Sequence, residues 1–393
     1  MSSDNSPGYR AERFVAPAEQ TFKLPDESSV TSTEAEGVIT VVKGDIKITF
    51  APQERQIRVS PYGIVNDDRA VSDKILLISS ASQLSQTDLW AALYALWLRR
   101  NEDDVAPAQL DSAIPNAAGL HSYLVHSGLG WIPDASDRDV LLLSRPAFWQ
   151  SAGSPLGLSW LQDPIPSTGH SANFPFPHIQ SFTRGPNILT THPLRPQKPA
   201  PGSLIYSRFI NALGQQLTFT HIDASNPAHF DKYTAWQNSD RVNVGWRERG
   251  DEEHHRTYLK ERLADPHIMG FIVAWDGDAA GYGEISWVKE DPMSTFVGGL
   301  GDYDQGTHLL VGEEKYRGRQ RFTAIMTSMK HMAFLRDART EVVVGEPRAD
   351  LPIIPRLIAY LPQEFNREFE LPHKRAVYFV LRRERFFQAA MLY

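Results

Sequence analysis

A histidine inside an apolar run, followed by a basic glycine turn, is the feature of this sequence best suited to chemistry. The run is Asp304–Gly312 with His308 inside it, and the turn is Tyr316–Phe322 with Gly318 at its centre. The run predicts a strand, and residues 322–336 have a helical pattern. A strand, a glycine turn and a helix N-terminus together form a site for phosphate groups, because unpaired backbone N–H groups and the helix dipole point at the anion. The spacing therefore predicts chemistry on a phosphate-bearing carrier beside an imidazole.

The overall composition favours a soluble, globular protein of two domains. At 393 residues the chain exceeds the usual size of one domain, and 41% of its residues are hydrophobic and 22% charged. A net charge of −7 argues against a nucleic-acid-binding protein. No apolar run approaches the ~20 residues of a membrane helix, and the polar first ten residues lack the pattern of a signal peptide. The last three residues are not a peroxisomal address, so we expect a cytoplasmic protein.

The sequence contains no cysteine, which restricts the chemistry further. Disulfides, thiolate metal sites and a thiol nucleophile are excluded, and the Gly-x-Ser-x-Gly elbow of a serine acyl-enzyme is not present. We therefore expect any group transfer to occur directly between two bound substrates, although a serine acyl-enzyme stays formally open. The neighbouring His254 and His255 would point in different directions on a helix, so we interpret them as part of a solvated charged face. We expect no metal site.

The first half of the chain divides by composition into three parts. Residues 1–35 are polar and poorly patterned, which predicts a flexible segment. Residues 36–150 predict an α/β domain, including a helix over Asp88–Arg99 with Thr87 as its N-cap. Residues 151–202 predict a proline-rich connector. It wraps one domain or lines a cleft, and a disordered linker is the alternative.

Proline is what distinguishes the connector. Eleven of the 27 prolines lie between Pro146 and Pro201. Because proline removes a backbone donor and fixes φ, this stretch cannot be continuous helix or central sheet. Large aromatic residues within the stretch favour the wrapped alternative; they are Phe148, Trp149, Trp160, Phe174 and Phe176.

Residues 203–393 predict a second domain, in which strands come first and strands alternate with helices later. This order indicates an α+β or α/β layer with a mixed sheet. The expected strands cover 217–220, 269–275, 281–288, the His308 run, 341–344 and 376–381, and the expected helices cover 231–237, 253–263, 322–336 and 352–360.

Dispersed residues of this second domain resemble the GNAT acyltransferases, and more narrowly the siderophore-biosynthesis acyltransferases of the fungal hydroxyornithine type. The matching residues occur in the family's order over roughly 150 residues. They are Trp236-Gln237-Asn238, Arg241-Val242, Trp246, residues 281–291, Asp304-x-Gly306-x-His308, Arg317-Gly318, residues 346–350, residues 371–376 and Arg385-Phe386-Phe387. Two positions depart from the family pattern: Gln320 stands where a second glycine is common, and Leu351 where an asparagine is usual.

The resemblance implies an α+β fold for residues 203–393, namely the GNAT fold, a central mixed sheet flanked by helices. It also suggests that the amino-terminal domain is a degenerate copy of the same fold. It implies that acyl-coenzyme A is the co-substrate and that partners are small molecules rather than nucleic acid or a membrane. It makes a homodimer reasonable.

The resemblance implies two catalytic residues, His308 and Glu346. An imidazole titrates near neutrality and can take a proton from the attacking nitrogen. Glu346 follows a Val-Val-Val run, so it lies at the carboxyl end of a strand, where α/β sheets place their ligands. The alternatives are a strand histidine satisfied by the backbone, and a glutamate that caps the helix region at Pro352 or pairs with Arg348.

The resemblance also assigns the residues that hold the two substrates. The coenzyme A contacts are expected from Leu309, Leu310 and Val311 of the strand, and from Arg317, Gly318, Arg319, Gln320, Arg321 and Phe322 of the turn, since arginine forks match phosphate oxygens. The amino-acid acceptor is expected to lie near Trp236, Asn238, Trp246, Glu284, Lys289 and Asp350. The competing interpretations are a solvated basic turn for the arginines and core packing for the tryptophans.

These expectations combine into one hypothesis for the reaction. The acyl group of an acyl-coenzyme A, acetyl or anhydromevalonyl or similar, is transferred to the hydroxylamino nitrogen of N5-hydroxy-L-ornithine or its hydroxylysine homologue. One alternative is an acyltransferase acting on an ordinary lysine or polyamine amine. The other is a non-catalytic protein that binds coenzyme A.

Overall fold

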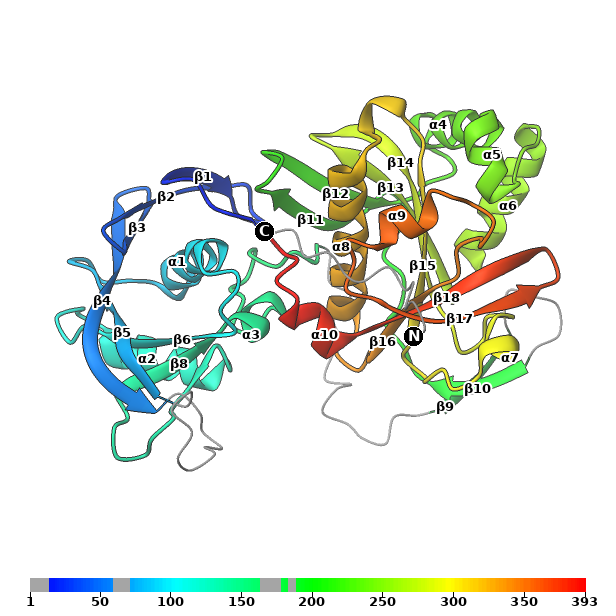
Figure 1. Cartoon of the computed structure of the whole chain (residues 1–393). Helices are drawn as coiled ribbons and strands as arrows, with labels where there is room; N and C mark the ends of the chain where they lie inside the picture. Colours follow the sequence, from blue (N-terminus) through cyan, green and yellow to red (C-terminus); the bar gives the residue numbers. More distant parts are fainter. Residues whose placement is uncertain (1–13, 59–70, 163–177, 183–188) are drawn as a thin grey trace, which may run out of the picture. The chain divides into compact units, whose positions relative to one another are not determined.

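The computed structural model describes residues 14–58, 71–162, 178–182 and 189–393, and the chain divides into two compact units (Figure 1). The carboxyl-terminal unit comprises the described residues of Leu161–Ile210 and Gln215–Met391. The amino-terminal unit comprises those up to Trp160, with Asn211–Gly214 and the last two residues. The division falls ten residues after the predicted boundary at 150, and most of the connector belongs to the carboxyl-terminal unit.

A mixed sheet forms the centre of the carboxyl-terminal unit. Its described strands lie in the order β11-β12-β13-β14-β15-β16-β18-β17. Every neighbouring pair is antiparallel except β15 and β16, which run parallel. The strands are β11 (Leu204–Ile210), β12 (Gln215–His221), β13 (Ile268–Trp275), β14 (Asp278–Trp287), β15 (Gln305–Val311), β16 (Val342–Gly345), β17 (Glu364–Leu371) and β18 (Lys374–Arg382).

Helices cover both faces of this sheet (Figure 1). On one face lie α4 (Pro227–Asn238), α5 (Asp240–Trp246) and α6 (Glu252–Ala264), whose apolar residues form one buried cluster with Leu310 of β15. A side-chain oxygen caps the first turn of each of these helices. The opposite face is covered by α8 (Arg319–Arg336), most of which is buried. The shorter elements are α7 (Ser294–Val297), η3 (Glu314–Tyr316), α9 (Ile354–Ile358) and α10 (Arg383–Gln388).

The amino-terminal unit also contains a mixed sheet, with strand order β1-β2-β3-β4-β5-β6-β8-β7 in its described residues. Its aromatic core surrounds the helix α1, with Trp90, Tyr94, Phe148, Trp149 and Trp160 all buried and their rings in contact. The elements are β1 (Glu19–Lys23), β2 (Ser29–Ala35), β3 (Val38–Lys43), β4 (Ile46–Arg58), β5 (Val71–Ser79), α1 (Gln86–Arg99), β6 (Val105–Leu110), α2 (Ala117–His126), β7 (Gly130–Trp131), β8 (Val140–Ser144) and α3 (Arg145–Trp149).

The two sheets have the same topology. In each, four antiparallel pairs are followed by one parallel pair, β5 with β6 or β15 with β16, and then by two antiparallel pairs. The long helix, α1 or α8, lies between the two parallel strands in the sequence of both units. The units differ after their second strand. There the carboxyl-terminal unit inserts α4, α5 and α6, whereas the amino-terminal unit has a two-residue turn, Glu36–Gly37, with both φ angles positive.

The structure corrects two predictions for the amino-terminal half. The prediction of a flexible segment over residues 1–35 is wrong for residues 19–35, because β1 and β2 pair there as an antiparallel ladder. The alternation that buries Phe22 and Val30 is short and lies among polar residues, so it gave a weak signal. The cap of α1 is Ser85 and not Thr87, because the Ser85 hydroxyl accepts the backbone N–H of Asp88.

Beyond Trp160, the described part of the proline-rich connector belongs to the carboxyl-terminal unit. Its strands β9 (His178–Phe182) and β10 (Leu189–Pro193) pair with each other. Arg195 then forms two hydrogen bonds with Glu290, at 2.7 and 2.8 Å. The ammonium of Lys198 lies within hydrogen-bond distance of four backbone carbonyls at the end of α6 and after it, at 2.7–3.1 Å. The predicted aromatic contacts of Phe174 and Phe176 lie outside the described residues.

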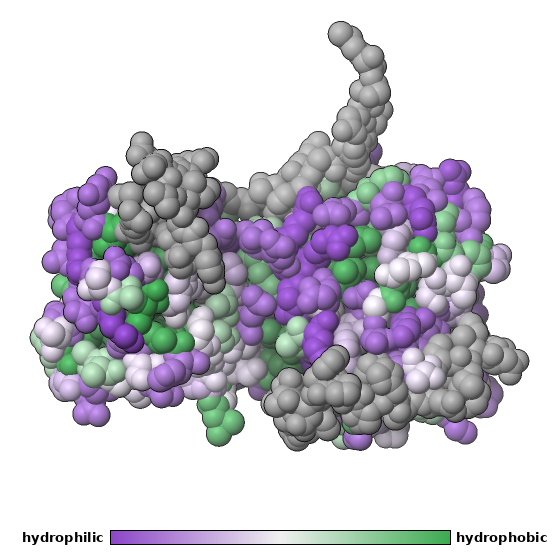
Figure 2. Space-filling view, turned by 90° about the horizontal axis from the view of Figure 1, so that it is seen from below, coloured by the Kyte–Doolittle hydropathy of each residue, from purple (hydrophilic) through white to green (hydrophobic). Residues whose placement is uncertain are grey.

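The described helices include none that is both long and apolar enough to cross a membrane. On the face seen in Figure 2, hydrophilic residues cover much of the described surface of each unit, with smaller hydrophobic areas between them.

Lys330 is an unusual buried charge in the middle of α8. Its Nζ donates a hydrogen bond to Thr307 Oγ1 of β15 at 2.6 Å, and the residue is almost completely buried. Burial disfavours the charged form and lowers the pKa of Lys330 from 10.5 to about 7. Between these two values the unfolded chain binds more protons than the folded chain, so this residue makes stability rise with pH over that window.

We expect the substitution Lys330→Met to remove this pH dependence. The free energy of unfolding of the wild type, minus that of the variant, should increase by up to about 1.4 kcal/mol per pH unit above pH 7 and be flat below it. Urea unfolding at pH 6, 7, 8 and 9 measures this difference. Lys260→Met, at an exposed position of α6, is the control and should leave the pH dependence unchanged. Parallel curves for the wild type and Lys330→Met would contradict the assignment.

Candidate functional site

The site is built where β15 and β16 diverge. These strands pair only at Gln305 with Val343 and Gly306 with Val344, whereas β15 pairs with β14 along its whole length. The bond from Gly312 N–H to Ala280 O shows which residues of β15 face β14, because bonded pairs alternate along an antiparallel ladder. Leu309 and Val311 therefore direct their backbone groups away from β14, on the side where β16 has diverged.

The two faces of β15 serve different purposes, because successive side chains of a strand point to opposite faces. Leu310 packs among the residues of α4 and α6, so His308 lies on that face. Thr307 lies on the other face and accepts the hydrogen bond from Lys330 of α8. His308 is therefore covered by the α4–α6 layer, where the indole of Trp246 contacts its ring with centroids 6.4 Å apart.

His308 and Glu346 come together as predicted from the sequence. His308 Nε2 lies 2.6 Å from Glu346 Oε1, and the other carboxylate oxygen forms an ion pair with Lys374 at the start of β18. Glu346 directly follows β16, so the divergence of the strands turns its side chain toward β15. The His308 side chain is 31% exposed and that of Glu346 is 13% exposed. The imidazole is thus accessible and the carboxylate is enclosed.

The surroundings keep Glu346 ionised. Burial raises its pKa, but the charge and hydrogen bond of His308, joined by those of Lys374, outweigh burial and lower the pKa to about 2. An ionised carboxylate only accepts hydrogen bonds, which assigns a proton to His308 Nε2. In the neutral ring Nδ1 then carries the lone pair, so the arrangement can accept a proton at Nδ1.

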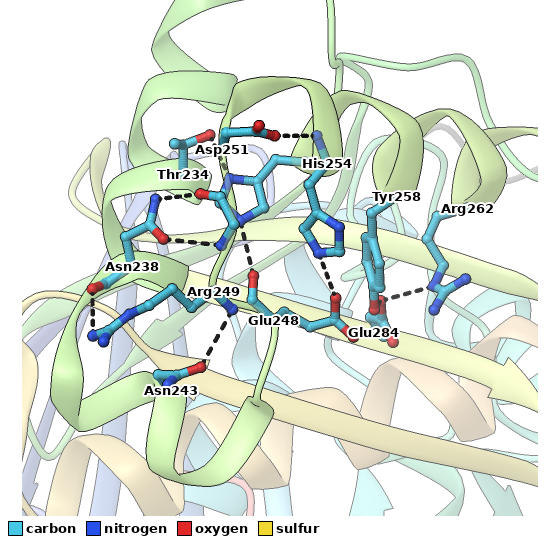
Figure 3. A network of polar contacts seen from close by, with 12 residues as sticks. Thr234, Asn238, Asn243, Glu248, Arg249, Asp251, His254, Tyr258, Arg262 and Glu284 are labelled. Atoms are coloured by element: carbon cyan, nitrogen blue, oxygen red, sulfur yellow. Dashed lines mark hydrogen bonds and ion pairs between the residues drawn. The ribbon is translucent and has the colours of Figure 1, made fainter.

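Glu284 lies on the other side of the His308 ring. It stands opposite His308 in the β14–β15 ladder, and its Oε2 is 3.8 Å from His308 Nδ1. Its Oε1 accepts hydrogen bonds from Tyr258 at 2.9 Å and Tyr282 at 3.0 Å, and from Arg262 at 3.3 Å. Figure 3 shows Tyr258 and Arg262 of α6 converging on Glu284. These buried partners hold the carboxylate in place beneath the imidazole.

The basic turn ends in a helix N-terminus without a side-chain cap. Gly318 is the N-cap of α8, and its φ of 123° and ψ of 159° lie in a region that other residues rarely adopt. Phe322 N–H is the first to bond within the helix, to Gly318 O. The preceding N–H groups, those of Arg319, Gln320 and Arg321, are the ones that an α-helix leaves unsatisfied. This N-terminus can therefore bind an anion.

The three arginines of the turn have different surroundings. Arg319 stacks on Tyr360 and donates to its hydroxyl, and Arg321 donates to Gln215, so both side chains are anchored to the protein. The Arg317 side chain is 54% exposed and has Glu314 at 3.6 Å. Of the three, Arg317 has the side chain best placed to meet a phosphate at the helix N-terminus.

Trp236 and Asn238 lie in α4 and hold neighbouring segments. Trp236 donates to Glu313 at 3.1 Å and packs flat on Gly312, where a Cβ would come within 2.3 Å of the indole. Asn238 binds both backbone groups of Gly250, in the loop between α5 and α6. Their contacts therefore position the ends of β15 and α6, and the structure does not bring Asn238 to His308.

The remaining predicted acceptor residues lie in three places. Trp246 Nε1 lies 3.4 Å from Leu309 O, beside the imidazole. Asp350 forms an ion pair with Arg348, which lies two residues beyond Glu346. Lys289 lies beyond the end of β14 and pairs with Asp302, so the structure does not bring it to the His308–Glu346 pair.

Sequence reasoning assigned no role to several residues that the structure places here. Lys374 pairs with Glu346, Tyr258 and Arg262 hold Glu284, and Arg241 donates to Gly312 O at 2.7 Å beside Arg317. Lys374 and Arg241 belong to the motifs that carry the resemblance, which was a signal for them. Tyr258 and Arg262 carried none, because they differ from ordinary residues of an amphipathic helix only through contacts made in the fold.

The described residues of the amino-terminal unit do not form this constellation. His308 and Glu346 each lie two residues after the last pair of the parallel strands, Gly306 with Val344. In the amino-terminal unit the last such pair is Ile78 with Leu110, so the corresponding positions are Ser80 and Ser112. The first turn of α1 is capped by Ser85, and Asp88 places a carboxylate at that N-terminus. The described structure of this unit therefore offers neither the imidazole–carboxylate pair nor an open anion site at α1.

One group of potential metal ligands occurs among the described residues, and it lies outside this site. His192, His267 and Glu290 bring their ligand atoms within 4.8 Å of one another, and all three are buried. Both oxygens of Glu290 already bind Arg195, and His267 lies 2.9 Å from Asp265. His254 and His255 also point to different partners, and His255 is buried, so the interpretation of a solvated face is wrong for it.

Comparison with known proteins assigns the family. A family model described as acetyltransferase (GNAT) domain matches residues 226–371. Acyltransferase ato1 of Omphalotus olearius is 62% identical over 98% of this chain and 98% of that protein. Acyltransferase fer5 of Mycosarcoma maydis is 47% identical over 96% of this chain and 93% of that protein. Hydroxyornithine transacylase SID3 of Ajellomyces capsulatus is 37% identical over 76% of this chain and 71% of that protein.

These relatives confirm the resemblance drawn from the dispersed motifs, and the domain match confirms the α+β GNAT fold. The matched residues include α4–α6, the β15–α8 turn and Glu346. This chain is therefore an acyltransferase that belongs to the GNAT superfamily, in the family of the fungal hydroxyornithine transacylases.

Proposed function

We propose that this protein transfers an acyl group from acyl-coenzyme A to the hydroxylamino nitrogen of N5-hydroxy-L-ornithine, a step of hydroxamate siderophore biosynthesis. The observation that carries the proposal is the contact between His308 and the ionised Glu346, beside the open edge of β15. A relative named hydroxyornithine transacylase, matched over most of both chains, supports the choice of acceptor.

The donor is proposed to lie along β15 and to end at α8. The N–H groups of the first turn of α8, with Arg317, suit the pyrophosphate of coenzyme A. The backbone groups of Leu309 and Val311 on the open side of β15 suit the amides of the pantetheine arm. This assignment places the thioester near His308, and the Leu309 N–H is a donor for its carbonyl oxygen.

The proposed reaction is direct attack in a ternary complex. The hydroxylamino nitrogen forms a bond to the thioester carbon, and its proton passes to His308 Nδ1. The C–S bond then breaks, and the proton neutralises the leaving thiolate. A hydroxylamine is less basic than an alkylamine and largely neutral at working pH, so positioning contributes more than a strong base. The lack of cysteine fits a route without a thioester on the protein.

We expect His308→Ala to lower kcat with N5-hydroxy-L-ornithine and acetyl-coenzyme A by about 10²-fold or more, because general-base assistance is lost. Glu346→Gln should also lower kcat, because the amide no longer carries the charge that orients the ring. Mass spectrometry of the hydroxamate product measures both. His254→Ala is the control, since this histidine pairs with Glu248 and not with His308 or Glu346. A folded His308→Ala variant with unchanged kinetics would exclude the role of His308.

The same assay distinguishes the proposal from its alternatives. Faster turnover of lysine or a polyamine than of the hydroxylamine would favour an ordinary amine acyltransferase. A thermal shift with acyl-coenzyme A but no turnover of any amine would favour a non-catalytic binding protein. A panel of acyl donors in the same assay identifies the acyl group.

We expect Gly318→Ala to weaken coenzyme A binding by about tenfold, because alanine at this φ is strained and the first turn of α8 must shift. Isothermal titration measures Kd. Gly298→Ala is the matched control: Gly298 also has a positive φ, of 67°, and open space around its Cβ, but it ends α7. Equal effects of the two substitutions would indicate general strain rather than a phosphate site.

We expect one coenzyme A to bind per chain, although the fold occurs twice. The first turn of α1 carries the capping pair Ser85–Asp88, whose carboxylate repels a phosphate. Isothermal titration of the full chain should give a stoichiometry near one, and Gly318→Ala should weaken that single event. A second event that survives in the variant would show that the amino-terminal unit binds coenzyme A.

A further inference from the structure

The segment after Glu346 carries a second charged pair on the same side as the catalytic carboxylate. The backbone of Arg348 forms an antiparallel β-bridge with Ala376 of β18. Two hydrogen bonds of 2.9 Å make this bridge, from Ala349 N–H to Arg375 O and from Val377 N–H to Pro347 O. This pairing keeps the segment extended. Because side chains two residues apart in an extended segment share a side, Arg348 lies on the side of Glu346. Asp350 lies in the turn that follows and is held to Arg348 by hydrogen bonds.

Arg348 and Asp350 bind each other without using all the donors of the arginine. Arg348 Nε and Nη2 donate to the two carboxylate oxygens at 2.9 and 2.5 Å. The Arg348 side chain is only 10% exposed, whereas that of Asp350 is 59% exposed. A guanidinium has five N–H donors, and the edge formed by Nη1 and Nη2 is its second fork for a carboxylate. The pair thus presents a fixed cation beside an accessible anion.

The charge around this pair is not balanced. Lys374 pairs with Glu346, and Arg247, in a left-handed conformation at the end of α5, reaches His373 O at 3.5 Å. Three cationic side chains, Arg247, Arg348 and Lys374, therefore face two carboxylates, Glu346 and Asp350. This local excess of positive charge favours an anionic group of a ligand at Arg348, while the exposed Asp350 can meet a cationic group.

We propose that Arg348 binds the α-carboxylate of the acceptor and Asp350 its α-ammonium, so that the protein selects a free amino acid over its decarboxylated analogue. This inference rests on the proposed function, which it makes more specific. The receptor would lie away from the reacting nitrogen by the five single bonds between that nitrogen and the carboxylate carbon of ornithine, at about 1.5 Å each.

This assignment replaces the charged residues expected from the sequence. Glu284 is enclosed by Tyr258, Tyr282 and Arg262, and Lys289 pairs with Asp302, so neither supplies the charge that a zwitterionic head group needs. Asp350 keeps its expected role as a residue that contacts the acceptor, and Arg348 is added as the residue that binds the acceptor's carboxylate.

The test compares N5-hydroxy-L-ornithine with N-hydroxyputrescine, which carries the hydroxylamine and the ammonium but no carboxylate. The wild type should prefer hydroxyornithine by about 10- to 100-fold in kcat/KM, the value of one charge-assisted fork. Arg348→Met should reduce that preference to within about threefold, by raising KM for hydroxyornithine and leaving N-hydroxyputrescine unchanged. Arg348→Lys, which keeps the charge without the fork, should restore part of the preference.

Two further variants separate recognition from folding. Asp350→Asn should raise KM for both acceptors, because both carry the ammonium. Arg375→Ala is the matched control, since Arg375 is the neighbouring exposed arginine and pairs with Glu368, and it should change neither acceptor. Thermal unfolding of each variant verifies that the fold is intact.

The outcomes distinguish this inference from the function on which it rests. No turnover of either hydroxylamine by the wild type would overturn both. Turnover of the two at similar kcat/KM, or an equal loss for both in Arg348→Met, would overturn only the carboxylate receptor and leave the proposed function standing.

Discussion

The early divergence of β15 and β16 is the constraint on which the site depends. At Gly306, the last residue of β15 that pairs with β16, a Cβ would lie 2.6 Å from Cγ1 of Val288, which directly follows β14, so this position has no room for a side chain. Beyond that point β16 no longer occupies the hydrogen-bonding edge of β15. The same divergence releases the backbone of Leu309 and lets Glu346 approach His308. If the parallel ladder continued past Gly306, the backbone of Leu309 would be bonded to β16 and Glu346 could not approach His308.

The sequence predicted the centre of the site better than its surroundings. His308, Glu346 and Gly318 stand out because few roles suit a histidine in an apolar strand or a glycine opening a helix. Tyr258 and Arg262 act through Glu284, which is 26 and 22 residues away, and no local pattern reveals this. Among the elements, α5 was missed because it spans only seven residues, and β17 because its exposed, charged residues hide the alternation of a strand.

The two units show how one topology is used with and without a site. Both sheets keep the same strand order and the same single parallel pair. The carboxyl-terminal sheet adds α4–α6 over the face that carries His308, whereas Glu36 and Gly37 close the corresponding hairpin directly in the other unit. A fold alone therefore does not carry the chemistry, which depends on the inserted helices and a few substitutions at the strand ends.

Lys198 connects the proline-rich segment to the chemistry without touching a substrate. Its ammonium donates hydrogen bonds to the last carbonyls of α6. Burial lowers the pKa of Lys198 to about 8, although the charge of Asp265 opposes the shift. The same helix carries Tyr258 and Arg262, the two residues that clamp Glu284 beneath the imidazole. The connector therefore holds the end of the helix that positions Glu284, so a change in its path would reach the surroundings of the imidazole.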